Sequence, residues 1–348
     1  MRHGLLSGKL FWAVGVMLLL PVAASAGYIA TGANSNVDGY LDMGPDEYGS
    51  WCSATFGGLG DHFNPAGAHT LQEAAFTSGF FLFAGGNQRE LLSGITDWQN
   101  VFAPDATLSR SVIMPNAFSD SSGNGVIDTA TSAFRVFGGA TDLAFDLTQR
   151  VDTFAAGVAF LRQDYAVTNN AATPISFWMV RAFDGDLLWD GGYDNDEVGT
   201  SMHGAGLGPY IFEQEASAPS VTAVTVSSLA GGDYYGGKHG ITPPNGPPMY
   251  AYGTDTQVWD AYGVPASWAN HVAGVGYNTN GVSGTQPPGS TSPYDGFVGL
   301  GFQIDDLAVG ETRMITVFHT YGQNTPVPEP TSLVLLALGA LGLRRRRR

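Results

Sequence analysis

The segment DGDLLWDGGYDNDE, which starts at Asp184, holds the densest run of side chains able to bind a cation. Carboxylates interspersed with glycine turns suit calcium, because this ion accepts several oxygen ligands in a flexible geometry. The spacing departs from an EF-hand loop, since Val198 stands where a ligand is required. The alternative is a solvated corner whose Asp and Gly residues only shape turns. The calcium interpretation names as ligands Asp184, Asp186, Asp190, Asp194 and Asp196.

A second candidate calcium loop is DSSGNGVID, which ends at Asp128. Oxygen-bearing side chains stand at alternate positions, and a glycine occupies the sharp turn, as in the first half of a calcium loop. The twelfth position is Thr131, which cannot supply the bidentate carboxylate that such a loop needs. The alternative is a glycine-rich hairpin loop. The candidate ligands are Asp120, Ser122, Asn124 and Asp128, and they imply no catalysis.

The sequence contains no recognisable catalytic motif. Its seven histidines form no HExxH and no close pair at zinc spacing, and there is no GxSxG nucleophile elbow. Cys52 is the only cysteine, so an intramolecular disulfide is excluded, and a lone cysteine is better explained as a small buried hydrophobe than as a nucleophile. We therefore expect a non-enzymatic protein that requires no cofactor, with calcium as an optional ligand.

Aromatic residues in one loop-like region favour an alternative function. The stretch VWDAYGVPASWANHV brings together Trp259, Tyr262 and Trp268, whose rings could stack on sugars. Paired carboxylates for glycoside hydrolysis need a spatial separation of about 5–9 Å, which the sequence does not fix. The alternative is thus a carbohydrate-binding or carbohydrate-active protein.

Charge and composition restrict the class of protein. The formal net charge is −16, a field that repels phosphate backbones and makes nucleic acid an unsuitable partner. The 48 glycines and 19 prolines predict many turns and few long helices. A hydrophobic content of 44% is too high for a disordered chain, so a folded β protein is expected.

Period-two patterns predict the strands that would position these residues. The clearest are residues 160–167 and 175–181, and in the second Arg181 shares a face with Ile175, Phe177 and Met179. The stretch NNAATP between them is interpreted as a hairpin turn. Further strands are expected near Phe80, Val112, Phe145, Val224, Leu300 and Ile315. The predicted fold is all-β, a large antiparallel β-sandwich with long Gly/Pro-rich loops.

The start of the chain has the three-part layout of a secretory signal peptide. Basic Arg2 and Lys9 precede an apolar run over 10–20, which is followed by small residues. We expect residues 1–26 to be removed by signal peptidase, with Ala24 and Ala26 marking the cleavage site. A retained membrane anchor is the alternative, and the shortness of the apolar run disfavours it.

The end of the chain is an apolar run from Leu333 to Leu343, followed by five arginines. As a helix the run spans roughly 16 Å, well short of the ~30 Å hydrocarbon core, so it predicts transient rather than permanent insertion in the membrane. Basic residues favour the cytoplasmic side of a membrane, so the arginine end would stay in the cytoplasm and the preceding domain would lie outside it. The residues of this basic stop are Arg344, Arg345, Arg346, Arg347 and Arg348.

This C-terminal arrangement closely resembles the PEP-CTERM sorting signal of Gram-negative bacteria. The matching motif is Val327, Pro328, Glu329 and Pro330, with the apolar run and arginines behind it. The resemblance implies recognition by exosortase and transient anchoring in the inner membrane. It also implies delivery to the cell surface or extracellular matrix, often in bacteria that make exopolysaccharide, a further expected partner. The LPxTG-type motif of sortase substrates is absent.

Two internal segments also look like the β-sandwich bodies of other PEP-CTERM proteins. They are the span from Phe145 to Trp189, with its VRxxDGDL-like corner, and the closing IDDLAVGETRMITVFHTYG. This looser resemblance supports the fold class. We expect a single exported domain over 27–325, a sorting signal over 326–348, and a structural or adhesive role at the surface or matrix.

Overall fold

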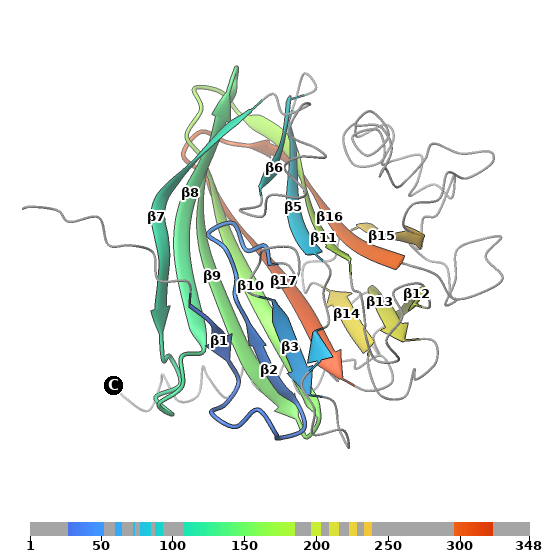
Figure 1. Ribbon diagram of the computed structural model, residues 1–348. Helices are drawn as coiled ribbons and strands as arrows, with labels where there is room; N and C mark the ends of the chain where they lie inside the picture. The colour runs from blue at the N-terminus through green and yellow to red at the C-terminus, as the bar shows by residue number, and fades with distance from the viewer. Residues whose placement is uncertain are drawn as a thin grey trace, which may run out of the picture.

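The computed structural model describes residues 27–51, 60–64, 72–73, 77–84, 88–92, 108–184, 196–202, 209–215, 223–227, 233–238 and 296–322. All regular elements in these ranges are β-strands, arranged in three antiparallel sheets (Figure 1). No helix in this described part is long and apolar enough to cross a membrane. The predicted all-β antiparallel class is confirmed, whereas the predicted signal peptide and the predicted sorting helix lie outside the described residues.

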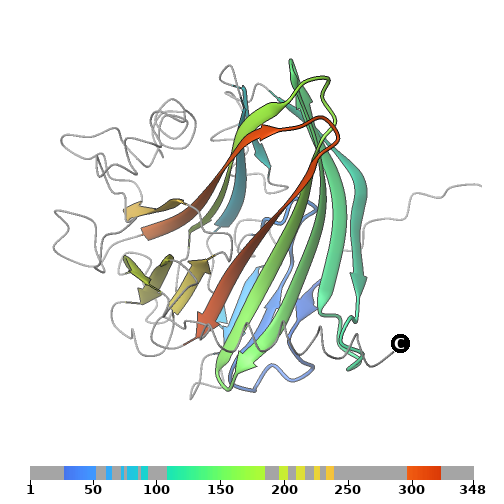
Figure 2. The same cartoon turned by 180° about the vertical axis from the view of Figure 1, so that it is seen from behind.

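The largest sheet has eight strands, and strands distant in the sequence lie side by side in it (Figure 2). At its centre β10 (Val158–Asn169) pairs with β9 (Thr141–Ala155) on one side and with β17 (Thr312–Gly322) on the other. The strands in spatial order are β12 (Asp196–Met202), β13 (Pro209–Glu215), β14 (Ala223–Ser227), β17 (Thr312–Gly322), β10 (Val158–Asn169), β9 (Thr141–Ala155), β8 (Thr129–Gly138) and β7 (Ser109–Ser119).

The other two sheets are smaller. The five-stranded sheet has the order β15 (Asp233–Lys238), β16 (Gly296–Leu307), β11 (Ile175–Asp184), β5 (Thr77–Ala84) and β6 (Gln88–Leu92). The four-stranded sheet has the order β1 (Ile29–Ala30), β2 (Tyr40–Met43), β3 (Asp61–Asn64) and β4 (Gln72–Glu73).

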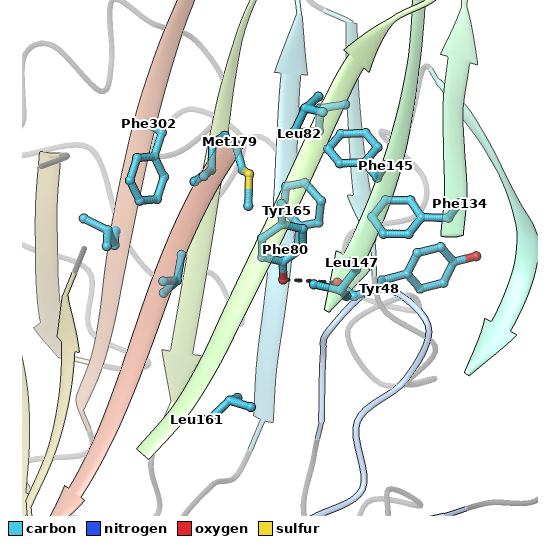
Figure 3. Packing of buried hydrophobic residues seen from close by; sticks show 14 of the residues in the cluster. Tyr48, Phe80, Leu82, Phe134, Phe145, Leu147, Leu161, Tyr165, Met179 and Phe302 are labelled. Atoms are coloured by element: carbon cyan, nitrogen blue, oxygen red, sulfur yellow. Dashed lines mark hydrogen bonds between the residues drawn. The ribbon is translucent and has the colours of Figure 1, made fainter. Parts of the chain in front are cut away.

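One hydrophobic cluster joins the three sheets. Phe80 of β5 contacts rings of the eight-stranded sheet, with centroids 5.5 Å from Phe145 and 5.4 Å from Tyr165. Phe134 and Phe145 stack at 4.7 Å on neighbouring strands (Figure 3). Ile29 of β1 is fully buried in the same cluster. The sheets therefore enclose a shared interior, as expected of a sandwich.

The predicted faces of β11 are confirmed, but the predicted hairpin is wrong. Phe177, Met179 and Arg181 lie on the buried face. However, β10 pairs with β9 and β17, whereas β11 pairs with β5 and β16, so residues 170–174 connect two different sheets. The side chain of Asn169 holds this connection, because its Nδ2 donates to Thr173 O at 2.9 Å and to Leu307 O at 2.8 Å.

Candidate functional site

Residues 45–51, called the core loop here, lie against the inner face of the eight-stranded sheet, where side chains from successive strands bind its carbonyl oxygens. Tyr48, Gly49, Ser50 and Trp51 are buried. Five donors come from strands of the eight-stranded sheet that are distant in the sequence. They are Asn116 Nδ2 to Pro45 O at 2.7 Å, Gln149 Nε2 to Asp46 O at 3.2 Å, Ser132 Oγ to Glu47 O at 2.7 Å, Tyr165 OH to Tyr48 O at 3.3 Å and Gln163 Nε2 to Gly49 O at 2.7 Å.

The core loop also binds itself. Asp46 Oδ1 accepts hydrogen bonds from Tyr48 N at 2.9 Å and from Ser50 N at 2.7 Å, and Asp46 O accepts one from Gly49 N at 3.2 Å. Gly49 has a φ of +87°, a left-handed conformation that favours glycine. A Cβ on Gly49 would lie 2.5 Å from the Tyr165 hydroxyl, so any larger residue at this position would clash with Tyr165.

Arg181 is the charged member of this interior. Its side chain is fully buried; Nε donates to Gln163 Oε1 at 2.8 Å, and Nη2 donates to Gly49 O and to Ser78 Oγ. Its guanidinium carbon lies 4.8 Å from the centre of the Trp51 ring. Burial lowers the pKa of Arg181. Arg181 thus links the five-stranded sheet to the core loop and to β10 of the opposite sheet.

His319 of β17 lies beside this arginine, in an aromatic setting. Its ring meets Trp51 edge to face at 4.9 Å and lies 6.0 Å from Phe183. Neither ring nitrogen of His319 has a hydrogen-bond partner among the described residues. Burial, and then the charge of Arg181, lower the pKa of His319 well below its usual 6.5. The imidazole is therefore neutral in the folded protein at neutral pH.

The neighbouring Tyr321 forms a second buried polar contact. Its hydroxyl donates to Asp61 Oδ2 of β3 at 2.8 Å. Burial, followed by the charge of Asp61 and this hydrogen bond, raises the pKa of Tyr321 well above 10. The contact holds β17 to the four-stranded sheet and leaves the phenol protonated.

The titration of His319 predicts an acid-sensitive fold. In the unfolded chain the imidazole of His319 binds a proton near pH 6.5, whereas in the folded protein its pKa lies well below that value. The contribution of His319 to stability is therefore fully present above pH 6.5 and decreases as the pH falls below it. One such group contributes a slope of at most about 1.4 kcal/mol per pH unit. We expect the free energy of unfolding in urea to change less between pH 6.5 and 5 in His319→Phe than in the wild type. Equal losses of stability in the wild type and in His319→Phe over this pH range would contradict the assignment.

The candidate calcium loop from Asp120 to Asp128 is the hairpin connection between β7 and β8. Asp120 accepts hydrogen bonds from Gly123 N at 2.6 Å and from Gly125 N at 2.7 Å. The hydrogen bond from Gly125, followed by those from Gly123, Asn124 and Ser122, outweighs the effect of burial and lowers the pKa of Asp120.

The other carboxylate of this loop is almost fully buried. Asp128 accepts from Ser121 N at 2.8 Å, from Ser122 N at 3.0 Å and from Thr129 Oγ1 at 2.7 Å. Burial alone would raise the pKa of Asp128, but these hydrogen bonds prevail and lower it. The hairpin interpretation is confirmed, and calcium binding here stays a prediction.

The remaining predicted site residues are mostly outside the described part. Asp184 ends β11 and Asp196 begins β12. Within the described residues, no three His, Cys, Asp or Glu side chains are placed to share a metal ion. The residues that lie outside it are Asp186, Asp190 and Asp194, the cleavage residues Ala24 and Ala26, the motif Val327 to Pro330, the arginines 344–348, and Trp259, Tyr262 and Trp268.

Sequence reasoning missed the core loop, although a signal for it was present. Gln149, Gln163 and Arg181 are polar residues on strand faces that are otherwise apolar, and all three are fully buried. Such residues require buried partners. The partners are backbone carbonyls of a loop more than a hundred residues away.

Comparison with known proteins identifies the C-terminal segment. Residues 326–348 match the PEP-CTERM protein-sorting motif, so the chain is an exported, cell-surface-directed protein processed by exosortase. No curated protein matches the chain. Among solved structures, a bacterial glucoamylase complexed with acarbose has a TM-score of 0.44 at 9% identity, covering 91% of this chain and 35% of that one. The chain thus spans about a third of the glucoamylase, and a likeness at this level carries no argument about function.

Proposed function

We propose that this protein is a non-enzymatic structural or adhesive component of the cell surface or extracellular matrix of a Gram-negative bacterium. It is exported through an N-terminal signal peptide and released after cleavage near Pro328 to Pro330. The observation that carries the proposal is the sorting motif at residues 326–348. In this scheme the apolar run and the arginines hold the tail in the inner membrane only until exosortase acts.

The interior of the described part supports a structural role. Its buried polar side chains, such as Gln149, Gln163 and Ser132, bind backbone carbonyls of the core loop. Ser132, the only one of these with a possible nucleophile, donates its hydroxyl proton to Glu47 O and not to a base that could activate it. The two described tryptophans, Trp51 and Trp178, are 1% and 7% exposed and offer no open ring to a sugar. The carbohydrate alternative rests on residues outside the described ranges and would be tested with a glycan panel.

The C-terminal peptide of the protein recovered from surface and matrix fractions tests the sorting step. Mass spectrometry is expected to find an end near Pro328 to Pro330, with residues 333–348 missing. Combined substitution of Pro328, Glu329 and Pro330 by alanine should leave the tail intact and retain the protein in the membrane fraction. The matched control is Thr331→Ala with Ser332→Ala, which alters the adjoining residues and should leave cleavage unchanged. An intact arginine tail on the wild-type surface protein would refute the proposal.

A further inference from the structure

Three buried polar side chains meet in the interior, and they come from three different parts of the fold. They are Trp51 of the core loop, Arg181 of β11 and His319 of β17, which are 1%, 0% and 0% exposed. The guanidinium carbon of Arg181 and the centre of the His319 ring lie 4.8 Å and 4.9 Å from the centre of the Trp51 ring. We call these three residues the interior polar cluster.

Each member of the interior polar cluster has a polar atom that the rest of the described protein does not satisfy. Arg181 Nη1, Trp51 Nε1 and both ring nitrogens of His319 have no hydrogen-bond partner among the described residues. The hydrogen bonds of Arg181 use only its Nε and Nη2 atoms. Buried polar groups left unsatisfied reduce stability, and in native interiors they are paired with protein groups or with ordered ligands. These four atoms therefore indicate a binding site.

The chemistry of the four atoms determines what the site can hold. The guanidinium of Arg181 and the indole N–H of Trp51 can only donate hydrogen bonds. The imidazole of His319 is neutral, so one of its nitrogens donates and the other accepts. A ligand that satisfies all three side chains must accept from Arg181 and Trp51 and also donate to His319. Water can do both, whereas a halide ion only accepts and would leave one imidazole nitrogen unsatisfied.

The charges around the interior polar cluster also favour a neutral ligand. The chain carries a net charge of −16, which repels anions. Burial lowers the pKa of Arg181, and the carboxylate of Asp46 is among the nearby groups that oppose this shift. A second buried carboxylate, that of Asp61, accepts a hydrogen bond from the Tyr321 hydroxyl at 2.8 Å. A bound anion would add a further negative charge to an interior that already contains two.

We propose that the interior polar cluster binds an ordered internal water molecule. The water oxygen accepts hydrogen bonds from Arg181 Nη1 and Trp51 Nε1, and the water donates one to the unprotonated nitrogen of His319. Such a water is a permanent part of the fold, because it joins β11, the core loop and β17 through groups that are otherwise unsatisfied. The inference is independent of the sorting step, since it concerns only the folded body.

A crystal structure of the processed exported protein, grown with sodium bromide in place of sodium chloride, tests the proposal. A density peak is expected within about 2.7–3.2 Å of Arg181 Nη1, Trp51 Nε1 and one nitrogen of His319, without the anomalous signal of bromide. An anomalous peak at this position would overturn the proposal in favour of an anion site. The absence of any peak between the three side chains would overturn it in favour of a dry interior.

Nuclear magnetic resonance provides a second readout in solution. The indole N–H of Trp51, assigned from its loss in Trp51→Phe, is expected to show a cross-relaxation peak with water in the wild type. Arg181→Met and His319→Phe should each abolish this peak, because each removes one of the groups that hold the water. The matched control is Arg162→Met, whose arginine side chain is 47% exposed on the outer face of β10, and it should keep the peak.

Far-ultraviolet circular dichroism would show which variants fold, and two variants are used so that failure of one to fold leaves the other. A wild type without the water peak at Trp51 would contradict the proposal. A peak of equal intensity in the wild type and in a folded Arg181→Met or His319→Phe protein would contradict it as well, since the water would then not depend on the interior polar cluster.

Discussion

Gly49→Ala is expected to be the most destabilising small substitution in the described part of the protein. The new Cβ would lie 2.5 Å from the Tyr165 hydroxyl, 2.7 Å from Gln163 Nε2 and 3.0 Å from Leu147 Cδ2. The residue would also keep a φ of +87°, which strains any side chain with a Cβ. Backbone strain and overpacking together predict a loss of roughly 2–5 kcal/mol in the free energy of unfolding, measured by urea denaturation.

Gly123→Ala is the matched control for this prediction. Gly123 has a φ of +74°, and a Cβ there would meet nothing within 4 Å. It therefore reports the backbone strain alone, about 1–2 kcal/mol. If both variants lost the same stability, the close packing of the core loop against β10 would not be an energetic feature of the fold.

Arg181→Met is expected to show the second large effect. The substitution removes hydrogen bonds to Gln163, Ser78 and Gly49 O, although Gly49 O keeps its bond from Gln163 Nε2. Each buried polar group left without a partner costs about 1–3 kcal/mol, and relief of the buried charge offsets part of that cost. We expect a net loss of roughly 2–4 kcal/mol in urea unfolding.

Two comparisons make the result for Arg181 interpretable. Arg162→Met alters an arginine on the outer face of β10 that is 47% exposed and paired with Asp164, so it should cost less than about 1 kcal/mol. A double-mutant cycle of Arg181→Met with Gln163→Leu should be non-additive, because the two side chains share the Gly49 carbonyl. An Arg181→Met protein as stable as the wild type would show that the arginine is kept for a purpose other than stability.

Strand identity and strand face could be predicted from the sequence, because alternate burial appears directly as alternate hydrophobicity. Residues 160–167 and 175–181 illustrate this, since both are strands whose apolar faces lie inside. The pairing of these strands could not be predicted in the same way. A tight turn and a connection between sheets use the same residue types, and the choice here depends on Asn169 reaching Leu307 O, 138 residues away.

The hydrogen bonds between Arg181 and the core loop could not be predicted from the sequence either. Arg181 shares a face with apolar residues in the sequence, but the sequence does not identify the groups that it binds. One of its partners is Gly49 O, 132 residues earlier in the chain. Backbone carbonyls leave no trace in a sequence, so a site built on them is visible only in the folded structure. The tail was predictable for the opposite reason, since a sorting signal is read as a linear segment.

The position of β17 in the eight-stranded sheet requires pairing between distant parts of the chain. This strand lies between β14 and β10, yet it is the last strand of the described chain, and Thr168 and Thr312, which bond to each other, are 144 residues apart. If the chain is exported from its N-terminus, as proposed, β17 would emerge after all its sheet partners. The pairing of β17 with β14 and with β10 would then be the last to form in the eight-stranded sheet. A chain ending before residue 312 would lack the strand that joins β14 to β10 in the eight-stranded sheet.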